Sequence, residues 1–174
     1  FGATLVDGQD TCEVTLTDIS RVVGSVLQDI DTQMVASVVE DEMLFGLENF
    51  GVPHDQIEER ISQTLSTVGI EDLRDREIAT LSGGQKQKVA IAAILAMRPR
   101  VLVLDEPTAA LDPASSTLVF ETLREANRTL GITIVVVEQK VALLSEYCNR
   151  VLVLNHGEIA LQGEPHEVFA HTDE

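Results

Sequence analysis

Leu81-Ser82-Gly83-Gly84-Gln85, followed by Val101-Leu102-Val103-Leu104-Asp105-Glu106-Pro107, is the stretch that decides the fold. Ser82 is a favoured N-cap residue, and the apolar run behind it predicts a buried helix through Met97. Two glycines are a poor choice at a helix start, since each costs about 1 kcal/mol against alanine in a helix interior. They do allow an anion to approach the amides at the positive end of the helix. The pattern therefore predicts a phosphate contact at this helix start.

Two adjacent carboxylates, Asp105 and Glu106, end the apolar run Val101–Leu104. Parallel sheets bind ligands at the carboxyl ends of their strands. There Asp105 is placed to hold Mg²⁺ through water, and Glu106 to polarise an attacking water. Taken alone, an acidic pair at a strand end is also an ordinary loop start. Together with the glycine-started helix, it favours a nucleotide hydrolase.

Continuous Val/Ile/Leu runs that alternate with helical patterns predict an α/β fold with a parallel sheet covered on both faces. A strand running into an Asp-Gly turn is expected at the beginning, and a hairpin and a short helix after Pro165 at the end. The other expected strands are 22–27, 101–105, 132–137 and 151–154. The expected helices are 39–47, 54–68, 82–97 and 114–130, with a loop at 29–33 and a connector at 75–80.

Composition limits the classes of function. The chain has 174 residues, of which 44% are hydrophobic, so one domain with a substantial core is expected. Twelve basic against 29 acidic residues give a net charge of -17, which argues against a nucleic-acid binder and is compatible with metal ions or a basic protein partner. Cys12 and Cys148 cannot form a disulfide framework and predict a reduced, intracellular chain.

On these motifs the chain is identified as a member of the ABC transporter nucleotide-binding subunits, and the resemblance covers nearly all of its length. It implies a P-loop NTPase-like, mostly parallel sheet flanked by helices, with an inserted helical subdomain and a small antiparallel β part. Residues 1–33 and 81–174 would form a truncated RecA-like ATPase core. Residues 34–80, which show helical patterns and no strand, would form the helical subdomain that leads to the signature motif.

The resemblance also assigns roles to residues, with ATP and Mg²⁺ as cofactors. Ser82, Gly83, Gly84 and Gln85 match the signature that contacts the γ-phosphate of ATP held by an opposing subunit. Asp105 matches the Walker aspartate that holds the metal, and Glu106 the catalytic glutamate. Asp112 with Leu111 matches the D-loop, which communicates across the dimer. Gln28 matches the Q-loop glutamine, which touches Mg²⁺ and senses the membrane subunit.

Within the family, the closest resemblance is to the energy-coupling-factor importers of vitamins and cobalt. It rests on Gln28-Asp29, Gln33, Glu42, Phe45-Gly46 and the segment 92–99. It implies a peripheral subunit on the cytoplasmic face of the membrane, paired with a second, identical or different nucleotide-binding subunit and docked on a transmembrane subunit. The solute would be set by a separate membrane component.

Two departures from the family pattern alter the expected activity. The 174 residues contain no Gly-Lys-Ser/Thr phosphate loop, and they open on Phe1 rather than methionine. We therefore expect that loop upstream of residue 1, and weak or absent ATP binding and hydrolysis by these residues alone. Gln139 stands where the family carries histidine, and glutamine cannot carry positive charge or exchange a proton. Hydrolysis is expected to be slowed or absent, although normal turnover remains open because Glu106 is present.

Three functional hypotheses follow. The first is an ATP-hydrolysing motor subunit of an importer. The second is a non-hydrolysing partner subunit that donates its signature motif in trans. The third is a soluble ABC ATPase of DNA repair or translation, against which the acidic charge and the lack of a coiled-coil insertion argue.

Overall fold

The computed structural model describes residues 2–170, and the chain divides after Val137 into two compact units. The first unit carries the parallel sheet and the long helices, and the second begins at Glu138. Each unit is described by itself. No helix among residues 2–170 is long and apolar enough to cross a membrane.

A three-stranded parallel sheet forms the centre of the first unit, in the order β3 (Val23–Val26), β4 (Val101–Asp105), β5 (Thr133–Val137). In its register Val26 lies beside Leu104, and Leu104 beside Val136. All three strands are rich in β-branched residues, which fit a pleated and largely buried surface. The predicted α/β class with a parallel sheet is confirmed.

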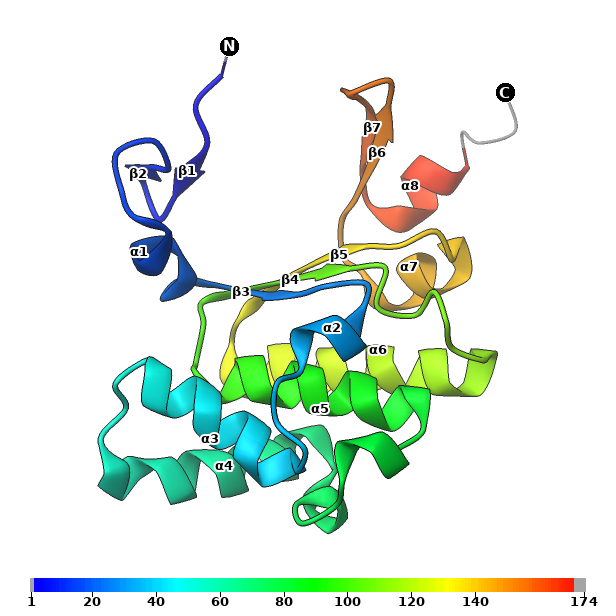
Figure 1. Ribbon diagram of the computed structural model, residues 1–174. Coiled ribbons are helices and arrows are strands. Elements are labelled where there is room, and N and C mark those ends of the chain that lie inside the picture. Colours follow the sequence, from blue (N-terminus) through cyan, green and yellow to red (C-terminus); the bar gives the residue numbers. More distant parts are fainter. Residues whose placement is uncertain (1, 171–174) are drawn as a thin grey trace. The chain divides into compact units, whose positions relative to one another are not determined.

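Four helices pack in two further layers beneath this sheet (Figure 1). α5 (Gly83–Ala96) and α6 (Pro113–Leu130) lie against the sheet, and α3 (Val39–Asn49) and α4 (His54–Val68) pack on their outer side. The apolar stripe of α4 explains its place, since its members recur at helical spacing and are all buried. These residues are Ile57, Ile61, Leu65 and Val68.

The helices of the first unit cover one face of its sheet, so the expectation of cover on both faces is not met within this unit. Leu102 and Leu104 are buried on the helix side. On the other face, Val135 and Val137 are 46% and 54% exposed. Alternation along a strand places Val103 of β4 on that same face.

The segment 29–33, expected to be a loop, contains the short helix α2 (Ile30–Gln33). Asp29 caps it, because its carboxylate accepts a hydrogen bond from the Thr32 amide. Polar composition concealed this turn of helix. The connector at 75–80 likewise contains a 3₁₀ turn, η2 (Ile78–Thr80).

Between residues 34 and 80 the chain forms α3, α4, η2 and the 3₁₀ turn η1 (Glu71–Leu73), with a single bridge from Val38 to Glu77. The predicted helical character of this segment is confirmed. Its status as a separate subdomain stays a prediction.

The start of the described chain is a hairpin of β1 (Leu5–Val6) and β2 (Gln9–Asp10), followed by α1 (Leu16–Ser20). The turn at Asp7 and Gly8 has positive φ at both residues, as a two-residue hairpin requires. The predicted Asp-Gly turn is confirmed.

The second unit contains α7 (Val141–Tyr147), β6 (Val151–Asn155), β7 (Glu158–Gly163) and α8 (Pro165–Phe169). β6 pairs antiparallel with β7, so the prediction that residues 151–154 join the parallel sheet is wrong. The cause is the turn at His156 and Gly157, both at positive φ, which folds the chain straight back. The predicted terminal hairpin and short helix are confirmed.

Candidate functional site

Gln28 and Glu106 meet at the carboxyl edge of the parallel sheet. Gln28 follows the end of β3 by two residues, and Glu106 directly follows β4. Because β3 and β4 are parallel neighbours, their carboxyl ends lie at the same edge. The Gln28 Nε2 atom donates a hydrogen bond to Glu106 Oε2 at 3.1 Å. Two residues predicted separately are therefore brought together.

The backbone of Glu106 is held in an unusual conformation. Its φ is 45°, in the left-handed region that residues other than glycine adopt uncommonly. The Glu106 amide donates to the Val137 carbonyl at 2.8 Å, which ties the turn to the neighbouring strand. Strain of this kind, of order 1–3 kcal/mol, persists where the surroundings fix it and clusters at functional sites.

Asp105 is the last residue of β4 and is exposed. The described residues hold no group of three or more His, Cys, Asp or Glu side chains that could bind a metal by themselves. Mg²⁺ at nucleotide sites instead takes one or two protein oxygens, and phosphates and water supply the rest. The Asp105 carboxylate and the side-chain oxygen of Gln28 are ligands of the required type. The residues present therefore fit a nucleotide-bound Mg²⁺.

The start of α5 is built as predicted. Ser82 is its N-cap, and its hydroxyl accepts from the Gln85 amide at 3.3 Å. Gln85 Oε1 in turn accepts from the Ser82 amide at 2.9 Å, which completes a capping box. Gly83 and Gly84 are the first two helical residues, and first-turn amides have no carbonyl partner four residues earlier. The two side chains thus fix the helix end, where the glycine amides are oriented for an anion.

Gly83 and Gly84 also allow α5 to approach the start of α6. A Cβ atom on Gly84 would lie 3.1 Å from the Cβ of Ser115, and one on Gly83 would lie 3.2 Å from Cδ2 of Leu111. Both distances are tighter than ordinary contacts. The glycines therefore have two uses: they leave room for an anion at the helix start, and they allow α5 to pack closely against the start of α6. A hollow of about 230 Å³ adjoins this point and is lined in part by Ser82, Gly84 and Ser115.

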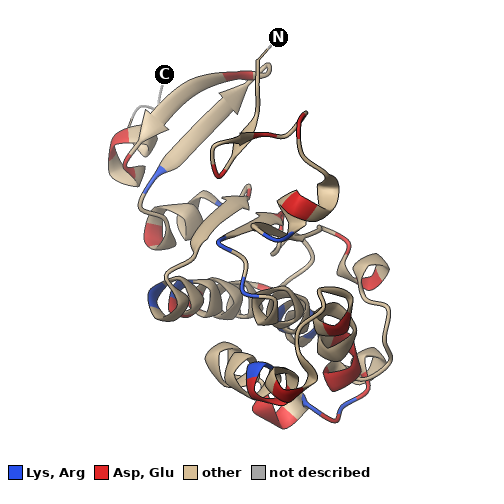
Figure 2. Ribbon diagram, turned by 90° about the vertical axis from the view of Figure 1, so that its left-hand side faces the viewer, with Lys and Arg blue, Asp and Glu red and all other residues tan. Residues whose placement is uncertain are grey.

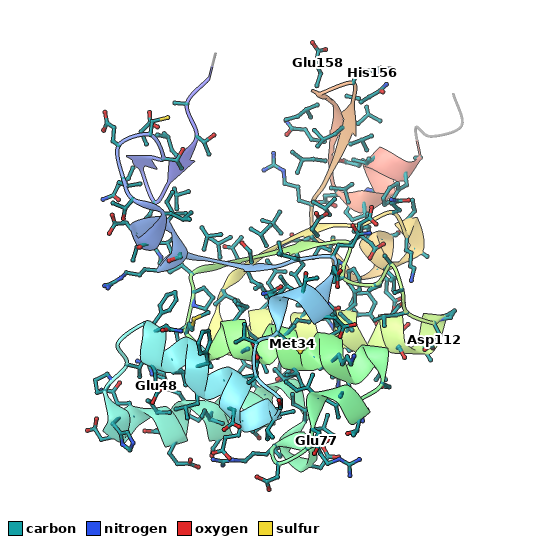
Figure 3. The ribbon with its side chains drawn as sticks, in the orientation of Figure 1. Met34, Glu48, Glu77, Asp112, His156 and Glu158 are labelled. Carbon is teal, nitrogen blue, oxygen red and sulfur yellow. The ribbon has the colours of Figure 1, made fainter. Side chains whose placement is uncertain are left out.

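Asp112 lies at the N-terminal end of α6 (Figure 3). Its Oδ1 accepts from the amides of Ala114 and Ser115, both at 3.0 Å, and its Oδ2 from the Ser115 hydroxyl at 2.6 Å. The hydroxyl contact is the main cause that holds the pKa of Asp112 below its ordinary value, and the amide bonds add to it. The carboxylate thus serves as a helix cap, and its part in nucleotide binding stays a prediction.

Gln139 belongs to the second unit, which begins at Glu138. Its amide donates to Glu138 Oε1 at 2.9 Å. It follows β5 by two residues, and its predicted role beside Glu106 stays a prediction.

Sequence reasoning missed the side chain that braces the chain beside Gln28. Gln33 Oε1 accepts from the Leu27 amide at 2.9 Å, and its Nε2 donates to the Ser25 carbonyl at 3.0 Å. Within residues 2–170, β3 is at the edge of its sheet, and Gln33 bonds to backbone groups of this edge strand and of the residue that follows it. The spacing of a glutamine five residues after Gln28 was noted only as a family marker.

A second missed contact joins α2 to the start of α5. Lys86 Nζ lies 2.7 Å from Asp31 Oδ1. Nothing in the spacing of the two residues predicts it, because they are 55 positions apart. The segment around Gln28 is therefore tied to the helix that begins with Gly83.

Comparison with known proteins agrees with this geometry. A family model described as "ABC transporter" matches residues 2–109, which is more than half of the chain. The chain belongs to the ABC transporter ATP-binding family.

Individual relatives indicate which kind of ABC transporter subunit the chain is most similar to. The chain is 42% identical over 173 residues to the energy-coupling factor transporter ATP-binding protein EcfA1 of Clostridium perfringens, covering 99% of this chain and 61% of that protein. It is 46% identical over 175 residues to EcfA1 of Symbiobacterium thermophilum, covering 99% and 60%. The solved structure of cbiO1 from C. perfringens, described as part of the ABC transporter complex cbiONQ, superposes with a TM-score of 0.90 at 38% identity, over 97% of this chain and 68% of that one. The chain thus spans about three-fifths of the length of the curated relatives it matches.

Proposed function

We propose that the whole protein containing this chain is the ATP-binding subunit of an energy-coupling-factor type importer. It binds ATP with Mg²⁺ and hydrolyses it to drive uptake of a solute of the vitamin or metal-ion type. The observation that carries the proposal is the hydrogen bond from Gln28 to Glu106 at the carboxyl edge of the sheet. The names of the relatives support the transporter class.

In this proposal the side chains at the sheet edge divide the chemistry between them. Glu106 accepts a proton from the attacking water, and the Gln28 amide holds one oxygen of that carboxylate in a fixed direction. Asp105, exposed at the end of β4, holds the metal together with the side-chain oxygen of Gln28. When bound, Mg²⁺ offsets the negative charge of the phosphates.

Two nucleotide-binding subunits pair in this proposal, so that the start of α5 in each faces the ATP of the other. Ser82 and Gln85 fix that helix end, and Gly83 and Gly84 present their amides to the γ-phosphate. The pair docks on a transmembrane subunit at the cytoplasmic face of the membrane. The description of cbiO1 as part of a transporter complex supports such an assembly.

The substitution Glu106→Gln in the whole protein tests the hydrolytic role. ATP hydrolysis should fall by at least about 100-fold, the contribution typical of a general base, while ATP binding persists. Glu121→Gln is the matched control, because Glu121 is an exposed carboxylate on α6. Equal turnover by Glu106→Gln and Glu121→Gln would exclude Glu106 as the base.

The alternative is a subunit that lends its α5 start to a partner and does not hydrolyse ATP. Gln139 favours it, because an amide cannot take up the proton that the family's histidine exchanges. Transport by the assembled complex discriminates between the two functions. Loss of transport on Glu106→Gln supports the motor, and unchanged transport supports the passive partner.

A further inference from the structure

A second cavity, of about 820 Å³, lies at the amino-terminal edge of the parallel sheet. Its lining includes the residues at which the three strands begin: Val22, Val23, Arg100, Val101, Ile132 and Thr133. Gln28 and Glu106 lie at the opposite, carboxyl edge. The cavity lies within the first unit and is distinct from the site described above.

Three arginines, Arg60, Arg98 and Arg100, line this cavity. Such a concentration is unexpected in a chain with 12 basic and 29 acidic residues, and Figure 2 shows how sparse Lys and Arg are along the ribbon. The one acidic residue in the lining, Asp7, forms an ion pair with Arg100. The lining therefore keeps an excess of positive charge.

The guanidinium of Arg60 is only partly paired within the protein. Its Nη2 donates to Gln56 at 3.2 Å, but its Nε is buried and has no hydrogen-bond partner. Folded proteins rarely leave a buried donor unpaired. Because the Nε atom is itself enclosed by the protein, a ligand in the cavity would meet the Nη groups of Arg60 instead.

Arg98 occupies a position that suits glycine better. It follows the end of α5 with a φ of 56°, in the left-handed region where glycine is usual after a helix. Its Nη2 donates to Gln63 Oε1 at 3.1 Å, and Gln63 also lines the cavity. A side chain kept despite an unfavourable backbone points to a use for that side chain.

We propose that this cavity binds a small anion whose phosphate or carboxylate head is held by Arg60 and Arg98 and whose body is apolar. Guanidinium groups match the geometry of both kinds of head. Apolar side chains, among them Leu95, Leu130 and Ile132, supply the surface for the body. The volume is within the range of small-molecule sites.

Isothermal titration of the whole protein, free of nucleotide, with phenyl phosphate and with inorganic phosphate tests this site. Phenyl phosphate should bind more tightly than phosphate, because only it has an apolar body. Arg60→Gln and Arg98→Gly should each raise its Kd about tenfold, the effect of losing one charged contact. Arg76→Gln, which removes an exposed arginine outside the lining, should leave the Kd unchanged.

Arg98→Gly separates binding from folding. Because it relieves the left-handed backbone, it should raise the Tm while it weakens binding. No binding of phenyl phosphate, or binding that neither Arg60→Gln nor Arg98→Gly weakens, would overturn the proposal. The second outcome would place the anion at another site, such as the start of α5.

Discussion

At the scale of single residues, several side chains of the candidate site serve the fold as well. Ser82 and Gln85 close a capping box, and Asp112 caps α6. Glycine at position 84 both presents an amide and allows α6 to approach. The sequence pattern predicted the cap at Ser82, because capping is a local requirement, whereas Asp112 entered the candidate site through the family resemblance and its capping role was not predicted. The pattern did not predict the hydrogen bond from Gln28 to Glu106, which depends on strand pairing.

The cap at Asp112 predicts that the stability of the protein depends on pH. Because its folded pKa is lowered, the cap stabilises the protein above the ordinary carboxyl pKa, and the contribution is lost as the pH falls through the lowered value. Asp112→Asn should therefore lower the Tm at pH 7, and the gap from wild type should shrink as the pH falls below the ordinary carboxyl pKa and through the lowered one. Thermal unfolding followed by circular dichroism across this range measures it. A gap that stays constant with pH would refute a charged cap.

At the scale of elements, helix and strand positions followed from periodicity and from capping residues, as the agreement at α4 and β4 shows. Two failures have physical causes. The polar segment 29–33 forms α2 because Asp29 caps it. In the sequence, the polar composition of this segment favoured a loop more strongly than a single capping residue favoured a helix. Residues 151–154 read as a buried parallel strand, but a tight turn committed them to a hairpin.

The contact between β3 and α5 makes a prediction of its own. A Cβ atom on Gly24 would lie 2.2 Å from Cγ2 of Ile94, so Gly24→Ala should destabilise the protein by about 1–3 kcal/mol through overpacking. Ile94→Leu removes that branch at constant volume and should recover part of the loss in the double variant. Denaturant unfolding measures both.

Gly46→Ala on α3 is the matched control, because its nearest atom, Met97 Sδ, would be at 3.6 Å. It should stabilise the protein by up to about 1 kcal/mol through helix propensity. If Gly24→Ala proved as benign as Gly46→Ala, the packing of β3 on α5 would be wrong.

At the scale of the whole molecule, the residues at the sheet edge and the glycines at the start of α5 contact different residues. Gln28 contacts Glu106 at the sheet edge, whereas Gly83 and Gly84 pack toward Leu111 and Ser115. Charge and composition argued against a nucleic-acid binder, but they located neither the sheet-edge residues nor the glycines of α5. The arginine-lined cavity escaped the sequence reading, because its lining comes from segments far apart in the chain.

The central claim is that Glu106 of one subunit and the start of α5 of another act on the same ATP. Mixing two inactive variants of the whole protein, Glu106→Gln and Gly83→Asp, tests it. Aspartate in the first turn favours the helix but repels a phosphate, and its Cβ would meet only the end of the Leu111 side chain, which can shift. Gly83→Asp should therefore fold and lose hydrolysis. If pairing is random, about half of the pairs contain one subunit of each variant, and each such pair has one intact site of two. The mixture should therefore regain about a quarter of wild-type ATPase activity. A mixture no more active than its separate components would contradict the claim.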